Sequence, residues 1–277
     1  MDSLDRHLSD LITAFHILHK HQVLDEHGQI SVRNPVDPST FFTSNVPAIL
    51  ISSKADLNQW RVADGSPIAN PYDGCHKIDE VSDLSEHYIH SSIYDRFPGV
   101  QSIIHSHCSS AIVYGLCDNW RSMPQPSYLM AGFIGPSPPI FDIAQFYESL
   151  PRSHPRNLLV NNQYLGDRLA GMLEKSNNNE VVMNGVVADV HKQKVVFRRG
   201  HGYTTWAGSI EDAVWRAIHI RRDADIQTTA KNQRDATDLH VVYLTEEEAR
   251  DCENTTNRAS REHWLAWPAE ADRSGFW

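Results

Sequence analysis

The chain has 277 residues, 40% of them hydrophobic and 22% charged, which is the composition of a globular protein long enough to bury a sizeable core. Its formal net charge of −10 at pH 7 argues against binding to nucleic acid or to an anionic membrane through the overall field. No apolar run approaches the ~18 residues of a membrane-spanning helix, and the acidic, amphipathic start MDSLDRHLSDLITAF does not resemble a secretory signal.

Hydrophobic periodicity predicts helices and strands that alternate along most of the chain. Apolar residues at helical spacing predict an amphipathic helix over 3–22. Further helices are expected at 85–97, with Ser85 as N-cap, and at 109–116, 162–179 and 209–230. Strands are expected at 30–33, 48–53, 100–107, within 138–143 and within 180–202. Because strands alternate with helices but also cluster, the pattern indicates a single layered α/β or α+β domain.

The last part of the chain, residues 231–277, differs from the rest by being polar and interrupted by tryptophans. Its acidic run EEEARD (246–251) is typical of a solvated helix face. We therefore expect a domain over 1–230 and a C-terminal extension that packs on it or on a neighbouring subunit.

The cysteines indicate a reducing compartment. They stand at 75, 108, 117 and 252, and no two of them form a CxxC pair, so neither a disulfide framework nor a zinc ribbon is expected. Cys108 has no dedicated base in the sequence and is interpreted as a small buried side chain. Reduced thiols and a cytoplasmic location follow as expectations.

Two histidines lie two residues apart at the end of the apolar run VQSIIHSH (100–107). Side chains at i and i+2 of a strand point to the same face, so the imidazoles of His105 and His107 are expected side by side, at a spacing that suits one tetrahedral metal. The strand runs into Cys108 at its carboxyl end, where sites of α/β folds tend to lie. The alternative is one buried and one exposed histidine in a chain that has sixteen.

Two further stretches carry residues of the same chemistry. Glu86 and His90 stand at i and i+4 in SEHYIHSSIY (85–94), on one face of the expected helix. His201 stands in a Gly-His-Gly turn before another helix. Taken singly, Glu86 is more commonly a solvated carboxylate and His201 a turn residue. A separate group of histidines at 16, 19, 21 and 27 is interpreted as a solvated face, because position 21 falls on a different helix face from position 16.

In their order along the chain, these stretches resemble the class II aldolase/adducin family over about residues 4–230. The resemblance is carried by GQISVR (28–33), LISSKADLNQWRVADGSPI (50–68), SEHYIHSSIY (85–94), VQSIIHSH (100–107) and GHGYTTWAGSIEDAV (200–214). It implies a single three-layer α/β/α domain around a mostly antiparallel sheet, in a homotetramer with sites at the subunit interfaces. It also implies that His105, His107 and His201 bind one divalent metal per subunit and that Glu86 is the catalytic carboxylate.

The sequence departs from the sugar-phosphate members of that family where those bind phosphate. Gln29 stands in place of an asparagine, Thr43-Ser44-Asn45 in place of a Thr-Pro-Ser-Gly-like loop, and Leu84-Ser85-Glu86 in place of Ser-Ser-Glu. Because a flexible amide donor and a hydroxyl are lost from the anion cradle, the predicted substrate is not phosphorylated. The candidate substrate-binding residues are Gln29, Arg33, Thr43, Ser44 and Ser85.

Two of the candidate residues have an equally common structural alternative. Arg33 suits a bidentate pair with a substrate carboxylate, but a surface salt bridge fits the same residue. Family lyases take a proton-donating tyrosine from the neighbouring subunit, and Tyr128 in MPQPSYLMAGF (123–133) is the nearest match. A tyrosine packed in the core is the alternative for Tyr128.

The residues and the resemblance together predict a metal-dependent carbon–carbon lyase. Three neutral histidines leave a coordination position for a small-molecule substrate, where a Lewis acid stabilises an enolate and a carboxylate moves the proton. The expected reaction is aldol cleavage or decarboxylation of a non-phosphorylated hydroxy or keto acid, or of a related carbonyl compound. Zinc is the first expectation, and iron, manganese and cobalt also suit the ligands. The alternatives are an Fe(II) oxidative decarboxylase and a non-catalytic adducin-like assembly module, against which the intact ligand set argues.

Overall fold

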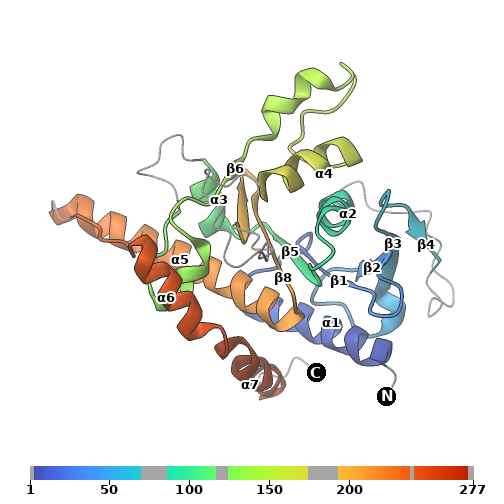
Figure 1. Cartoon of the computed structure of the whole chain (residues 1–277), viewed down its shortest axis with the longest axis horizontal. Coiled ribbons are helices and arrows are strands. Elements are labelled where there is room, and N and C mark those ends of the chain that lie inside the picture. The colour runs from blue at the N-terminus through green and yellow to red at the C-terminus, as the bar shows by residue number, and fades with distance from the viewer. Residues whose placement is uncertain (1–2, 70–85, 117–123, 174–192, 238–239, 274–277) are drawn as a thin grey trace, which may run out of the picture.

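The computed structural model describes residues 3–69, 86–116, 124–173, 193–237 and 240–273. At its centre lies an eight-stranded sheet in the order β4-β3-β2-β1-β5-β8-β7-β6, antiparallel except for the pair β6 and β7 (Figure 1). The strands are β1 (Gln29–Arg33), β2 (Thr40–Ser44), β3 (Leu57–Arg61), β4 (Pro67–Ile68), β5 (Ser102–Ser106), β6 (Ile140–Phe141), β7 (Val195–Arg198) and β8 (Gly202–Ala207). The chain therefore has the mostly antiparallel sheet that the family resemblance implies.

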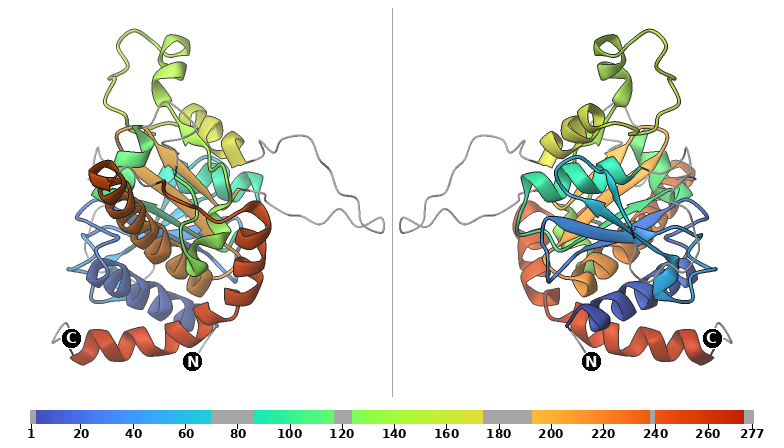
Figure 2. Two further views of the ribbon diagram at one scale, coloured as in Figure 1. Left: turned by 90° about the vertical axis from the view of Figure 1, so that its left-hand side faces the viewer. Right: turned by 90° about the vertical axis from the view of Figure 1, so that its right-hand side faces the viewer.

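Helices cover both faces of this sheet. Helices α1 (Ser3–Lys20) and α5 (Ile210–Thr237) lie on one face, and α2 (His87–Arg96) and α4 (Gln163–Ala170) lie on the other (Figures 1 and 2). Consecutive residues of one strand belong to different hydrophobic cores, because their side chains point to opposite faces of the sheet. Ile104 belongs to the core under α1 and α5, whereas Ile103 belongs to the core under α2 and α4. The three-layer α/β/α architecture is confirmed.

Most predicted elements are present, with shifted ends. The helix expected at 109–116 is α3 (Ser109–Gly115), and the strand expected within 138–143 is β6. Helix α4 ends at Ala170 and is followed by the 3-10 turn η5 (Gly171–Leu173). Residues 174–192, which include the end of the helix expected at 162–179 and the start of the strand region expected at 180–202, lie outside the described residues.

The strand predicted at 48–53 is wrong. These residues form a turn and an extended segment outside the sheet, and Ile49 and Leu50 are exposed at 50% and 64%. The strands of this region are β2 and β3, which flank the apolar run on either side. The run ends where Ser52 and Ser53 donate their backbone N–H groups to Asp56, a local turn that competes with strand pairing.

The C-terminal segment folds into two helices, α6 (Glu246–Thr256) and α7 (Ala259–Arg273). Helix α6 starts with a capping box between Thr245 and Glu248, exposes its first glutamates and buries Ala249 against the 3-10 helix η3 (Leu129–Ile134). Helix α7 packs against α1 and α5, and its Trp267 is 4% exposed. The segment therefore lies against the α1 and α5 side of this chain (Figure 2). In the described part of the chain, no helix combines the length and apolar character required to cross a membrane.

Candidate metal centre

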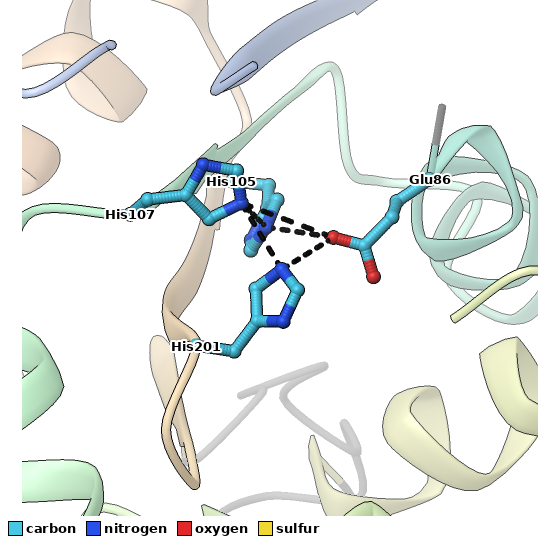
Figure 3. A group of neighbouring side chains, drawn as sticks. All are labelled: Glu86, His105, His107 and His201. Carbon is cyan, nitrogen blue, oxygen red and sulfur yellow. Dashed lines mark hydrogen bonds and ion pairs between the residues drawn. The ribbon is translucent and has the colours of Figure 1, made fainter. Parts of the chain in front are cut away.

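Three histidines, one from β5, one from just after it and one from a nearby turn, lie close together. His105 lies in β5, His107 lies just beyond the end of that strand, and His201 lies in the turn between β7 and β8. The Nε2 atom of His107 is 2.9 Å from Nε2 of His105 and 3.1 Å from Nε2 of His201. Figure 3 shows the three rings converging on one point. The i and i+2 spacing thus gives the side-by-side pair expected from the sequence.

The turn that carries His201 depends on its two glycines. Gly200 and Gly202 have φ angles of +66° and +119°, which disfavour residues with a side chain. A Cβ atom on Gly202 would lie 1.9 Å from the carbonyl oxygen of Ser106 and 3.1 Å from Cα of His107. The absence of a side chain therefore lets the turn lie directly against the end of β5 and brings His201 to His107.

The carboxylate of Glu86 completes the group from the other side. Glu86, and not the expected Ser85, occupies the N-cap position of α2; its side chain forms no capping hydrogen bond, and the residue is 5% exposed. Its Oε2 atom lies 3.0 Å from Nε2 of His105, 2.9 Å from Nε2 of His201 and 4.0 Å from Nε2 of His107. These four ligand atoms all lie within 4.8 Å of one another. Three imidazoles and a carboxylate form a donor set that suits zinc and several other divalent metals.

A buried arginine holds Glu86 in this position. Arg198, the last residue of β7, is 1% exposed and donates from Nη2 to Oε1 at 2.7 Å and from Nη1 to Oε2 at 2.9 Å. The backbone N–H of Val160 also donates to Oε1, at 2.6 Å. Burial by itself would raise the pKa of Glu86, but the charge of Arg198 together with the interactions with His105 and His107 outweighs it and holds the pKa well below its usual range. Glu86 is therefore ionised.

Hydrogen bonds on the outer side of two histidines fix their rings. Nδ1 of His105 donates to the carbonyl oxygen of Tyr203 at 3.0 Å, which leaves the Nε2 lone pair facing the centre. Burial and the charge of Arg198 hold the pKa of His105 well below its usual value, so this ring is neutral. Nδ1 of His107 lies 3.1 Å from the carboxylate of Asp25. Burial would lower the pKa of His107, but its hydrogen bonds to Asp25 and Glu86 raise it to about 9.

Asp25 and Arg198 are the residues of this centre that the sequence analysis missed. The signal for Arg198 was its position at the end of a strand, three residues before His201, in VVFRRGHG. Asp25 also accepts hydrogen bonds from the backbone N–H groups of His27 and Gly28. An aspartate before a glycine is typical of a turn, so its sequence context did not indicate a contact with His107. Each contact joins segments far apart in sequence.

A cavity of about 280 Å³ adjoins two of the histidines. Its lining comprises His27, His107, Ile112, Leu159, Gly200 and His201. Two aliphatic side chains and a glycine thus face the imidazoles, with no acid or lysine among the lining residues. The cavity offers room for a small molecule beside the donor atoms of His107 and His201.

Three residues predicted to bind substrate form hydrogen bonds inside the chain. Arg33, 6% exposed, donates to the carbonyl oxygens of Pro38, Tyr94, Phe97 and Val100, and its guanidinium stacks on the ring of Tyr94. Thr43 accepts from the indole N–H of Trp60, and Ser44 donates to the carbonyl oxygen of Val46. The structure thus uses Arg33 to join β1 to α2, rather than in the expected carboxylate or surface pair. Ser85 lies outside the described residues.

Gln29 and Tyr128 have different surroundings. Gln29 of β1 pairs with His105 of β5, so its side chain lies on the same face as that ring. Its Oε1 atom is buried and has no hydrogen-bond partner among the described residues. The hydroxyl of Tyr128 is instead hydrogen-bonded to Nδ1 of His219 in α5 at 2.5 Å. Gln29 therefore lies next to His105 in the sheet, whereas the hydrogen-bond partner of Tyr128 is His219 and not a histidine of the candidate metal centre.

Comparison with known proteins identifies the family. The model of the Class II Aldolase and Adducin N-terminal domain matches residues 9–228. This chain belongs to the class II aldolase/adducin family. A curated family relative, the decarboxylase tropJ of Talaromyces stipitatus, is 36% identical over 274 residues, which cover 96% of this chain and 94% of that protein.

Solved structures of class II aldolases share the fold. The L-fuculose 1-phosphate aldolase from Glaciozyma antarctica has a TM-score of 0.67 and 16% identity, over 99% of this chain and 92% of that one. An aldolase II superfamily protein from Pseudomonas syringae has a TM-score of 0.67 and 17% identity, over 100% of this chain and 96% of that one. At these identities the likeness concerns the fold of the class II aldolase family and not the substrate.

Proposed function

We propose that this protein is a metal-dependent carbon–carbon lyase that decarboxylates, or cleaves by retro-aldol chemistry, a non-phosphorylated hydroxy or keto acid or a related carbonyl compound. The observation that carries the proposal is the convergence of His105, His107, His201 and Glu86, with ligand atoms within 4.8 Å of one another. The relation to a decarboxylase over nearly the whole chain supports decarboxylation as the first reaction to test. Zinc is the first metal to test, before iron, manganese and cobalt.

The roles of the residues follow from their contacts. His105, His107 and His201 would hold a divalent ion, which would supply Lewis-acid stabilisation of the oxygen that gains negative charge when the carbon–carbon bond breaks. The chain orients its donors beforehand, since Tyr203 fixes the ring of His105 and Asp25 fixes the ring of His107. In a decarboxylation the bonding electron pair stays on the remaining carbon as an enolate, and a proton replaces the lost CO2. Oε2 of Glu86, beside the imidazoles, is placed to handle that proton.

The surroundings of the centre support a substrate less polar than a sugar phosphate. Thr43 and Ser44 are engaged in hydrogen bonds within the chain, and Ile112 and Leu159 line the cavity. Gln29, with a buried carbonyl oxygen on the face of His105, is the substrate-binding residue that we retain from the sequence analysis. Its amide suits a hydroxyl or carboxyl group of the substrate.

The proposal includes a homotetramer in which a neighbouring subunit completes the site. The family resemblance assigns the proton-donating tyrosine to a neighbouring subunit, and Tyr128, which is hydrogen-bonded to His219 in its own chain, is the residue we propose for that role. The C-terminal segment packs on its own domain through α6 and α7, and we propose that it also borders the subunit contact. The molar mass in solution, from light scattering, tests the assembly.

The first experiment is elemental analysis of the purified protein beside the double variant His105→Ala/His107→Ala. We expect about one equivalent of metal per chain in the natural protein and none in the double variant. His7→Ala, an exposed histidine on α1, is the matched control and keeps the metal. Absence of metal from the natural protein, even after reconstitution, would contradict the proposal and favour an adducin-like binding role.

The second experiment is a search for CO2 release from a panel of hydroxy and keto acids, under air and under argon. Equal turnover in both atmospheres supports the lyase, because the reaction needs no oxidant. Turnover in air alone, with oxygen uptake and bound iron, would replace it with the oxidative decarboxylase. Aldehyde or ketone products without CO2 would indicate retro-aldol cleavage.

A further inference from the structure

Arg198 reaches the metal-ligand group from a strand that carries no ligand. It ends β7, and the residue paired with it on β8 is Gly202, which has no side chain to obstruct the path towards β5. The guanidinium forms a two-point pair with Glu86, and its Nη2 also donates to the carbonyl oxygen of Leu158 at 3.0 Å. Its Nη1 atom lies 3.0 Å from Nε2 of His105. Glu86 and Leu158 therefore hold this fork in place, and its Nη1 atom lies beside the ring nitrogen of His105 that faces the centre.

The two oxygens of Glu86 differ in what they contact. Oε1 accepts from Arg198 and from the backbone N–H of Val160, at 2.7 and 2.6 Å, and faces the protein. Oε2 accepts from Arg198 at 2.9 Å and faces His105 and His201. A divalent ion bound by the histidines would lie next to Oε2 of Glu86. The negative charge of that carboxylate is already balanced by Arg198. A carboxylate whose charge is paired with a guanidinium attracts a cation less strongly than a free carboxylate does, and the lone pair that accepts from Nη1 is not available to the metal.

We propose that Arg198 is a positioning residue that keeps Glu86 from acting as a strong fourth ligand of the metal. The carboxylate then remains available to move a proton, and the fourth coordination position remains available to substrate. The inference rests on the proposed function, because it requires a metal at the three histidines. A purely structural role, in which the ion pair only joins β7 to α2, makes a different prediction for metal affinity.

The test is cobalt(II) binding to the full-length, chelator-treated protein, measured by competition with a chromogenic chelator and by visible absorption. In Arg198→Met we expect cobalt to bind about tenfold more tightly, whereas loss of a residue that merely supports a metal ligand typically weakens binding by about 10- to 100-fold. We also expect an altered visible spectrum, because Glu86 would then join the coordination shell. Arg199→Met, next in sequence and paired with Asp142 at the surface, is the matched control and should leave both unchanged.

The double variant Arg198→Met/Glu86→Gln separates a route through Glu86 from other effects. If Arg198 acts through Glu86, the gain in affinity and the spectral change disappear when position 86 is glutamine. A gain that persists undiminished in that background would overturn the inference, since the charge of Arg198 would then act on the metal directly. Unchanged or weaker affinity of Arg198→Met, with an unchanged spectrum, would also overturn it.

Two further measurements keep the outcome decisive. If Arg198→Met does not fold, Arg198→Lys retains the charge but cannot form the two-point fork, and it should show a smaller gain and a smaller spectral change. Natural-type affinity and spectrum in Arg198→Lys would then contradict the inference. If the natural protein itself binds no cobalt, the proposed function fails and this inference falls with it. If the natural protein binds cobalt and the Arg198 variants bind it with the same affinity and the same spectrum, this inference fails and the proposed function stands.

Discussion

The carboxylate of Asp25 lies 3.1 Å from Nδ1 of His107, on the far side of the ring from the Nε2 atom that faces His201. The carboxylate both orients this ring and increases its basicity, so it is expected to strengthen metal binding. Asp25→Asn should therefore weaken cobalt or zinc binding by roughly 10- to 100-fold, measured by competition with a chelator.

The asparagine variant retains an oxygen that can accept from the N–H groups of His27 and Gly28, so the local turn should persist. Asp56→Asn, which alters another turn-forming aspartate, is the matched control. Equal metal affinity in both variants would show that Asp25 serves the turn alone.

Metal uptake should depend on pH through His107. In the metal-free protein its pKa is about 9, so the ring is protonated at pH 7, whereas a ligand nitrogen must be neutral. The proton has to leave when metal binds, and affinity should rise with pH until about 9. Calorimetry at pH 7 in two buffers of different ionisation enthalpy should show release of about one proton per metal. Identical heats in the two buffers would contradict this assignment.

Gly202 should be intolerant of any side chain. Its φ of +119° and the 1.9 Å approach of a Cβ atom to the carbonyl of Ser106 predict that Gly202→Ala lowers the free energy of unfolding by at least ~2 kcal/mol. The same change should reduce metal binding, because it forces His201 away from His107. Chemical denaturation monitored by circular dichroism measures the first effect.

Gly99→Ala is the control for Gly202→Ala. A Cβ atom at Gly99 would meet no heavy atom within 4 Å, so this variant should stay within ~0.5 kcal/mol of the natural protein. Equal stability of the two variants would mean that the turn can move away from β5 without loss.

Asp223 should make stability depend on pH. Burial raises its pKa to about 6 from 3.8, even though Ser127 donates two hydrogen bonds to it. The folded state therefore holds this proton more tightly than the unfolded state, and the resulting stability is complete below pH 3.8 and lost as pH rises through about 6. Relative to Asp223→Asn, the metal-free natural protein should gain up to roughly 3 kcal/mol between pH 7 and pH 4.

The comparison requires urea unfolding of both proteins at several pH values. Asp225→Asn changes an exposed aspartate on the same helix and provides the control for the loss of one charge. A constant difference between the natural protein and Asp223→Asn across this pH range would exclude the predicted proton uptake.

The pairing of His105 with His107 was predictable from local geometry, whereas the addition of His201 as a third candidate ligand came from the family resemblance. The two-residue period of a strand puts His105 and His107 on one face whatever the strand packs against. The Gly-His-Gly turn likewise marks a close backbone approach at His201, although its partner is not local. The order of such segments along the chain was specific enough to indicate the family, which the match over residues 9–228 confirms.

The strand expected at 48–53 shows where local pattern is insufficient. An apolar run with isoleucines fits a strand, but a run joins a sheet only where a neighbouring strand offers hydrogen-bond partners. In this chain β1 pairs with β2, and β2 pairs with β3. The run that includes Ile49 and Leu50 forms part of the connection between β2 and β3. Arg33 is a similar case, since the backbone carbonyls that surround it come together only when α2 packs on β1.

The sequence by itself therefore determined the layered fold and three candidate ligands, because strand period and glycine turns are local properties and the order of segments along the chain carries the family resemblance. Only the tertiary structure decided what surrounds those ligands. Arg198 and Glu86 are 112 residues apart, and Asp25 and His107 are 82 apart. The order of the strands in the sheet and the position of the first residue of α2 bring each charged residue to its partner. Those long-range placements set the ionisation of Glu86 and the basicity of His107, and with them the chemistry that the site supports.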